Sequence, residues 1–280
     1  MALADAHMRT DAIGVYHPPA KGELRIVSLV PSLTELLFAL DLGSHVVGRT
    51  HYCVHPQASL ADVPSLGGTK KIRMARLLEA RPTHVLMNID ENPKEMADAI
   101  TRAGIDVIAT HPMTPLDNIV LYRLLGGIFN RSDEAEALGA RFMEAYDALT
   151  EAATSWPARK VLYLIWKAPW MTVAPDTYIS ANLNLLHWQT IGPSGEERYP
   201  KIEIGPALLQ EVDLILFASE PYAFKQADID AFHASFPGVA SRLSLIDGEM
   251  TSWFGSRAIE GLRYLHDFAE RKISAGKACR

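Results

Sequence analysis

Side chains suited to binding a ligand follow the apolar segments of this chain that are expected to be strands. The first of these segments, residues 25–30, ends at Pro31, and Ser32 then opens the sequence Ser-Leu-Thr-Glu before an apolar run. This sequence is typical of a capping box, so we expect a helix that begins near Ser32, with Glu35 reaching back to the cap. The free N–H groups of such a helix would face an acidic or carbonyl edge of a ligand.

Three potential metal ligands, His51, Cys53 and His55, follow the next expected strand, residues 45–50. Zinc would need three or four such ligands within tetrahedral reach, and no second cluster of histidine or cysteine completes the set. The favoured interpretation is a hydrogen-bonded loop that turns at Pro56. A histidine or cysteine that donates axially to a metal already held in a chelate remains an alternative.

Aromatic residues also gather after the expected strands, and four of the five tryptophans lie in or near these loops. Such rings either pack between layers of a fold or line a cleft that holds a flat ligand, and the group as a whole favours a cleft. The predicted ligand-binding residues are Pro31, Ser32, Tyr52, Cys53, Trp166, Trp170, Tyr178, Trp188, Tyr222, Trp253 and Phe254.

The elements that would position these residues recur in the two halves of the chain. In each half an apolar strand comes first, and a helix, a strand, an acidic loop, a helix and a further strand follow later. Strands separated by helices predict parallel sheets with right-handed crossovers, so we expect an α/β protein with two lobes and mainly parallel sheets. Apolar residues from Leu138 to Leu149 recur every three to four positions, which predicts one long, rigid connecting helix. The predicted divisions are an N-terminal extension (1–24), an N-terminal lobe (25–131), the connecting helix (132–155), a C-terminal lobe (156–273) and a tail (274–280).

Composition excludes several classes of protein. A formal net charge of −6 argues against nucleic acid as the main partner, because phosphate binding needs a concentrated basic surface. No apolar run reaches the roughly 20 residues of a membrane span. Two cysteines, Cys53 and Cys279, make no disulfide framework, and the N-terminus shows no signal-peptide core, which leaves a cytoplasmic location open. The sequence also lacks the nucleophile-elbow, P-loop, dinucleotide-binding and HExxH motifs, so we expect no enzymatic activity.

Four segments carry a resemblance to a known family. The blocks RIVSLVPSLTELLFALDLGSHVVGRTHYCVHP, GGTKKIRMARLLEARPTHVLM, ASEPYAFK and GEMTSWFGSRAIEGLRYL resemble the helical-backbone substrate-binding proteins of ABC importers, in the branch of vitamin B12 and ferric-siderophore receptors. The resemblance covers roughly residues 25–269. It implies two α/β lobes joined by a long helix, a ligand cleft between the lobes, and periplasmic residence.

The same resemblance implies the partners. The ligand would be a metal chelate, namely cobalamin or another corrinoid, haem or a ferric siderophore, with no intrinsic cofactor, and the protein is expected to be a monomer. One glutamate of each lobe would dock on the transmembrane permease subunits; Glu220 matches in the C-terminal lobe, and either Glu91 or Glu95 in the N-terminal lobe. Two other hypotheses remain: a cytoplasmic metal or cofactor enzyme that uses His51, Cys53 and His55, and an interaction protein whose cleft is filled by Trp188.

Overall fold

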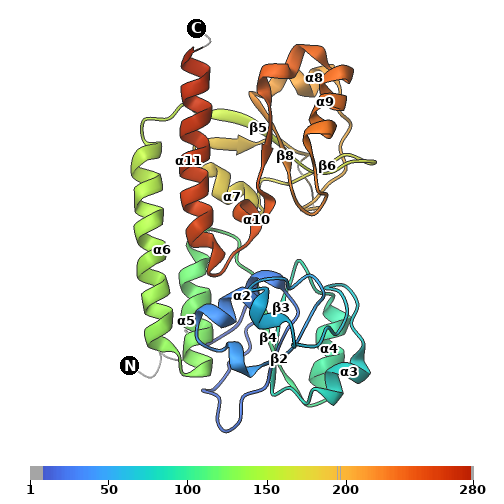
Figure 1. Ribbon diagram of the computed structural model, residues 1–280, viewed down its shortest axis with the longest axis vertical. Helices are drawn as coiled ribbons and strands as arrows, with labels where there is room; N and C mark the ends of the chain where they lie inside the picture. The colour runs from blue at the N-terminus through green and yellow to red at the C-terminus, as the bar shows by residue number, and fades with distance from the viewer. Residues whose placement is uncertain (1–8, 194, 196, 279–280) are drawn as a thin grey trace. The chain divides into compact units, whose positions relative to one another are not determined.

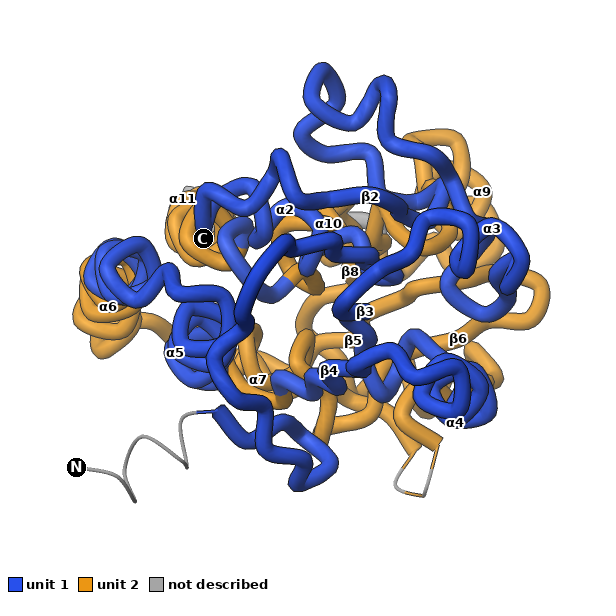
Figure 2. The backbone as a smooth tube through the Cα atoms, turned by 90° about the horizontal axis from the view of Figure 1, so that it is seen from below, with its two compact units in different colours: residues 1–112, 116–142, 254–257 blue, residues 113–115, 143–253, 258–280 orange. Residues whose placement is uncertain are grey.

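The computed structural model describes residues 9–193, 195 and 197–278, and these form two compact α/β units. Figure 2 colours unit 1 (residues 1–112, 116–142 and 254–257) and unit 2 (113–115, 143–253 and 258–280) separately. The first eight residues of the predicted N-terminal extension and the last two of the predicted tail, with Cys279, lie outside the described part. Among the described residues, no helix combines the length and hydropathy that a membrane crossing needs.

Unit 1 contains a four-stranded parallel sheet in the order β2-β1-β3-β4, of which Figure 1 labels β2, β3 and β4. Alternate residues of its strands share one face, as the pleat requires. Val27, Val85 and Val107 lie on the face that packs against Leu77 and Ile100 of two helices. The elements are β1 (Ile26–Ser28), α2 (Pro31–Ala39), η1 (Gly43–His45), β2 (Val46–Arg49), η2 (Ala58–Leu60), α3 (Met74–Glu79), β3 (His84–Asn88), α4 (Lys94–Arg102), β4 (Asp106–Thr110) and α5 (Asp117–Phe129).

Unit 2 repeats this order of strands, as the sequence predicts. Strand β5 pairs in parallel with β7 and β8, and β8 with β9, while the short β6 is antiparallel to β5. Parallel pairing between strands that helices separate gives the predicted α/β class. The elements are β5 (Arg159–Trp166), β6 (Met171–Thr172), α7 (Tyr178–Asn184), β7 (Trp188–Thr190), α8 (Pro206–Glu211), β8 (Leu214–Ala218), α9 (Gln226–Ser235), η3 (Pro237–Arg242), β9 (Leu243–Ile246) and α10 (Gly248–Ser252).

Two 22-residue helices complete the fold. Helix α6 (Ser132–Ala153) is the expected connecting helix: its first residues belong to unit 1 and its remainder to unit 2. Leu138, Phe142 and Leu149 are buried along one face, as their spacing predicts. Helix α11 (Arg257–Ala278) continues beyond residue 273, where the C-terminal lobe was expected to end.

The capping box expected at the start of α2 is absent. The helix begins one residue earlier, with Val30 as its N-cap and Pro31 in the first turn, and no side chain caps it. The carboxylate of Glu35 instead accepts two hydrogen bonds from Arg257, from Nε at 2.8 Å and from Nη2 at 2.9 Å. Glu35 therefore ties α2 to a segment 222 residues further along the chain.

That segment, residues 254–257, returns to unit 1 and is anchored there by α5 as well. The N–H of Gly255 donates to Asn118 Oδ1 at 2.7 Å, and Tyr122 donates to the Gly255 carbonyl at 2.8 Å. Gly255 has φ +80°, and a Cβ at this position would lie 3.2 Å from the Ser32 carbonyl oxygen. A side chain would therefore be strained and crowded here, which accounts for the glycine.

The bidentate pair between Arg257 and Glu35 is expected to stabilise unit 1. Both side chains are largely buried, so Arg257→Ala leaves a carboxylate without its main charged donor and lowers the free energy of unfolding by about 2 kcal/mol. Arg263→Ala, in the same helix α11, is the control, because its pair with Glu260 is exposed and contributes at most about 0.5 kcal/mol. Urea denaturation measures both values; equal effects of the two substitutions would contradict the assignment.

Candidate functional site

The carboxyl ends of the unit 1 strands converge on one edge of the parallel sheet, where ligands of such folds bind. Asn92, which follows β3, organises this edge. Its side-chain oxygen accepts the Asn88 N–H at 2.9 Å, and its amide group donates to the carbonyls of Thr69 at 2.9 Å and Leu29 at 3.4 Å. One buried amide therefore fixes the loops after β1 and β3 together with the turn at residues 67–69.

Tyr52 is the predicted site residue that this edge exposes most. Its side chain is 55 % exposed, and its ring lies 4.0 Å from that of His51, centroid to centroid. Both rings rest on Gly68, where a Cβ would lie 3.1 Å from His51 Cε1 and 3.4 Å from Tyr52 Cε2. A glycine here lets the two rings lie against the backbone, so that Tyr52 offers an aromatic face to a ligand.

Cys53 lies beneath this surface and offers a ligand nothing to contact. Its Sγ is buried, 3.1 Å from Thr50 Oγ1 and 3.9 Å from the Ser28 carbonyl oxygen. Burial raises the pKa of the thiol, which keeps it neutral. The thiol packs the loop against β1, and a contact between Cys53 and a ligand stays a prediction.

The metal interpretation of His51, Cys53 and His55 gains no support from the geometry. His51 is exposed, Cys53 is buried and His55 is half-buried, and His55 precedes a cis peptide bond to Pro56. No three His, Cys, Asp or Glu side chains within the described ranges are arranged to hold a metal ion. The hydrogen-bonded loop is the interpretation that fits these positions.

Ser32 and Pro31 lie at the same edge but differ from the expected geometry. Ser32 is buried in the first turn of α2, and among the described atoms its hydroxyl has no hydrogen-bond partner. Pro31 is half-buried and supplies no N–H to the helix start. A direct contact between either residue and a ligand stays a prediction.

Unit 2 presents a second aromatic surface at the carboxyl ends of β5 and β8. Trp166 ends β5, is 39 % exposed and makes an edge-to-face contact with half-buried Tyr222, with ring centroids 5.5 Å apart. Lys167 Nζ lies 5.5 Å from the centroid of the Tyr222 ring and donates to the carboxylate of Asp228 in α9. The Lys167 hydrogen bond lowers the pKa of Asp228, and the same bond raises the pKa of Lys167. The exposed aromatic rings are thus bordered by a fixed ion pair.

Three other predicted ligand-binding residues of unit 2 lie mostly in its interior. Trp170 stacks on Phe224, with the ring planes 6° apart, and packs edge-on against Phe217. Trp188 is 0 % exposed, pairs within the sheet and meets Phe268 edge-on, while Tyr178 is buried in the first turn of α7. The structure offers no surface of the Trp188 indole to a ligand, so a contact between Trp188 and a ligand stays a prediction.

Trp253 and Phe254 are adjacent in sequence but belong to different units. Phe254 is buried at the start of the segment that returns to unit 1. Trp253, at the end of α10 in unit 2, is half-buried, and its indole N–H donates to Glu220 Oε2 at 3.1 Å. Glu220 therefore interacts with a predicted ligand-binding residue of its own unit.

Glu91 and Glu95, the two candidates in unit 1 for docking on a permease, differ in exposure. Glu95 is exposed in the first turn of α4, where a carboxylate also suits the helix dipole. Glu91 is half-buried in the loop after β3, next to Asn92. A partner surface would reach Glu95 more readily than Glu91.

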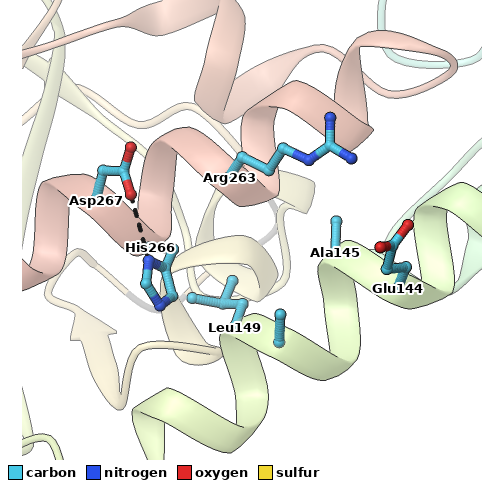
Figure 3. Close-up of a pocket in the computed structure, with 7 residues that line it drawn as sticks. Glu144, Ala145, Leu149, Arg263, His266 and Asp267 are labelled. Atoms are coloured by element: carbon cyan, nitrogen blue, oxygen red, sulfur yellow. Dashed lines mark hydrogen bonds and ion pairs between the residues drawn. The ribbon is translucent and has the colours of Figure 1, made fainter.

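A shallow pocket lies elsewhere in unit 2, between α6 and α11. Figure 3 shows Ala145 and Leu149 from α6 facing His266 and Arg263 from α11. Its volume is about 210 Å³, below the roughly 300–1,000 Å³ of ordinary small-molecule sites. None of the predicted ligand-binding residues lines it. A corrinoid or haem would not fit there, so the exposed rings are the better candidates.

Sequence reasoning placed Asn92 and Lys167 after expected strands but gave neither a role, and it missed Asp228. The Asn92-Pro93 dipeptide is typical of a turn, but nothing local shows that its amide reaches two other loops. Lys167 directly follows Trp166, and its position after an expected strand was the available signal. Its partner Asp228 lies 61 residues away in sequence, and sequence patterns do not predict a pair that far apart.

Comparison with known proteins identifies the family to which this arrangement belongs. A family model described as periplasmic binding protein matches residues 26–241 of the 280. The chain belongs to the periplasmic binding protein family. The match covers all the strands of unit 1 and the strands of unit 2 up to β8.

Individual proteins are similar to this chain in sequence or in fold. The vitamin B12-binding protein of Yersinia pestis (strain Pestoides F) is 25 % identical over 202 residues, which cover 71 % of this chain and 70 % of that protein. The crystal structure of the periplasmic vitamin B12 binding protein BtuF of Vibrio cholerae matches with a TM-score of 0.78 at 17 % identity, over 89 % of this chain and 97 % of that one. The structure of S. aureus IsdE complexed with heme matches with a TM-score of 0.73 at 19 % identity, over 89 % and 99 %. These similarities confirm the predicted fold class.

Proposed function

We propose that this protein is the substrate-binding protein of an ABC importer and that it binds a large metal chelate: a corrinoid, haem or a ferric siderophore. The observation that carries the proposal is the pair of exposed aromatic surfaces, with Tyr52 at the carboxyl edge of one parallel sheet and Trp166 at that of the other. Rings of this kind bind flat ligands through stacking and burial. Family membership and the vitamin B12 and heme ligands named for its relatives support the same class of ligand.

The remaining parts of the proposal follow from this role. The protein presents the ligand to permease subunits in the periplasm, where its relatives are described, and performs no chemistry of its own. We propose Glu95 as the docking glutamate of unit 1, because it is exposed in the first turn of α4. The protein acts as a monomer without an intrinsic cofactor. The enzyme hypothesis is not favoured, because Cys53 is buried and makes no cluster with His51 and His55.

Titration with a panel of chelates tests the proposal. We expect cyanocobalamin, haemin or a ferric hydroxamate siderophore to quench the tryptophan fluorescence of the purified protein and to saturate at one molecule per chain. Free N-acetyltryptophanamide of matched absorbance controls for absorption of light by the chelate. Failure of all three chelates to bind, together with stoichiometric zinc or iron in the purified protein, would favour the metal-enzyme hypothesis instead.

A further inference from the structure

Helix α10, the five-residue helix that precedes Trp253, is attached to its neighbours in unit 2 by several hydrogen bonds. Asp247 caps its start by accepting the Met250 N–H at 3.2 Å. The Thr251 hydroxyl lies 2.5 Å from that of buried Tyr163, and the Thr251 carbonyl accepts from Asn182 at 3.0 Å. Hydrogen bonds therefore fix α10 to β5 and to α7, both within unit 2.

Two glycines bring the neighbouring backbones unusually close to α10. A Cβ at Gly261 of α11 would lie 2.4 Å from the Met250 carbonyl oxygen, and one at Gly248 would lie 2.6 Å from the Glu220 nitrogen. The N–H of Gly248 also donates to Ser219 Oγ at 2.8 Å. Residues 219–220, which follow β8, therefore pack closely against the start of α10. This contact fixes the backbone of Glu220 relative to that of Trp253.

Two hydrogen bonds hold Trp253 in place, one from its backbone and one from its side chain. Its backbone N–H donates to the Glu249 carbonyl at 3.0 Å, and its indole N–H donates to Glu220 Oε2 at 3.1 Å. Hydrogen bonds to an ionised acceptor are stronger and more directional than neutral ones, so the carboxylate selects one orientation of the ring. Trp253 is half-buried, so part of the residue remains accessible to solvent.

We infer that Glu220 is a positioning residue that fixes the indole of Trp253 in the orientation that stacks on the ligand. This inference rests on the proposed function and deepens it, because it gives Glu220 a task inside the binding site. A ring fixed before the ligand arrives loses little side-chain entropy on binding, which raises affinity without any added contact. If Glu220 also docks on the permease, as predicted, the same carboxylate that accepts the indole N–H would contact the permease.

The free protein provides a test that needs no ligand. The chain has five tryptophans, so ¹H–¹⁵N spectra should show five indole N–H signals, and Trp253→Phe identifies the relevant one by its loss. In Glu220→Ala we expect this signal to shift upfield and its exchange with solvent to quicken at least tenfold, while the other four stay in place. Glu220→Gln keeps an acceptor oxygen and should restore the signal. Glu211→Ala, at the exposed end of α8, is the control and should change none of the five.

Affinity provides the second readout, with cyanocobalamin and haemin as probes. We expect Glu220→Ala to weaken binding at least fivefold, Glu220→Gln to stay within twofold of the wild type, and Glu220→Ala to have no further effect in the Trp253→Phe background. An unchanged Trp253 signal in Glu220→Ala would overturn the inference, as would an altered signal with unaltered affinity. Absence of binding by the wild-type protein would overturn the proposed function, whereas the spectra alone decide whether Glu220 fixes the ring.

Discussion

Replacing Asp11 with asparagine is expected to lower the free energy of unfolding of unit 1 by about 3 kcal/mol. Asp11 is buried, and its carboxylate accepts the N–H groups of Ile13, Val15 and Ala109 at 2.9–3.0 Å and lies 3.2 Å from Nε2 of His17. An asparagine places an NH₂ group against one or more of these donors. Because Ala109 belongs to β4, the substitution also loosens the attachment of residues 9–20 to the sheet.

The same residue gives the stability a defined dependence on pH. Burial alone would raise the pKa of Asp11, but the hydrogen bonds from His17 and the three backbone N–H groups outweigh it and lower the pKa. A carboxylate with a lowered pKa stabilises the folded state fully above its unfolded value of about 3.9, and this contribution is lost as the pH falls through the folded-state pKa. The difference in stability between the wild type and Asp11→Asn should therefore be largest near neutral pH and shrink below about pH 4.

Hydrogen exchange of the β4 amides measures this effect locally. Asp106→Asn is the matched control, because Asp106 lies in the same strand but is exposed, 3.9 Å from His84, and should contribute no more than about 0.5 kcal/mol. Equal protection of the Ala109 amide in the wild type and in Asp11→Asn would contradict the role given to the buried carboxylate.

Removing a ring from either exposed aromatic surface is expected to weaken ligand binding strongly. Tyr52→Ala and Trp166→Ala should each cost about 1–2 kcal/mol, a loss of about 5- to 30-fold in affinity, because stacking on one aromatic ring contributes that much. Trp253→Ala should cost at least about 1 kcal/mol for the same reason. Isothermal titration calorimetry with the chelate that binds the wild type measures all three.

Trp156 supplies the control for these substitutions. Its ring packs against His266, with centroids 5.6 Å apart, and it follows a helix rather than a strand. Trp156→Ala should leave affinity within twofold of the wild type while removing a ring of the same kind. An unchanged affinity in Tyr52→Ala or Trp166→Ala would remove that residue, and with it that surface, from the binding site.

The repeated fold was predictable because its signals are local. Apolar runs such as residues 84–88 and 214–217 have the composition of buried strands, and turn residues separate them from helices. The start of α2 shows where this reasoning stops. Glu35 has the spacing of a capping residue, but Pro31 occupies the first turn and Arg257, far along the chain, takes the carboxylate. A tertiary ion pair overrides the local pattern.

The sequence predicts which candidate side chains follow the strands, but not which of them are exposed. The carboxyl ends of parallel strands locate Tyr52 and Trp166 correctly on exposed edges, because topology alone fixes where those edges are. Burial of Trp170 and Trp188 depends on Phe224 and Phe268, residues 54 and 80 positions away. A single sequence carries no signal that separates an exposed ring from a packed one over such distances.

The absorbance spectrum of the protein isolated from its native host tests the central claim most directly, since it does not depend on a chosen panel of ligands. If the exposed rings hold a metal chelate, the purified protein should carry visible bands of a corrinoid, haem or ferric siderophore, which denaturation releases together with about one metal ion per chain. Tyr52→Ala and Trp166→Ala proteins prepared in the same way should carry less of the chelate per chain than the wild type. A colourless wild-type protein, from cells shown to contain these chelates, would contradict the account.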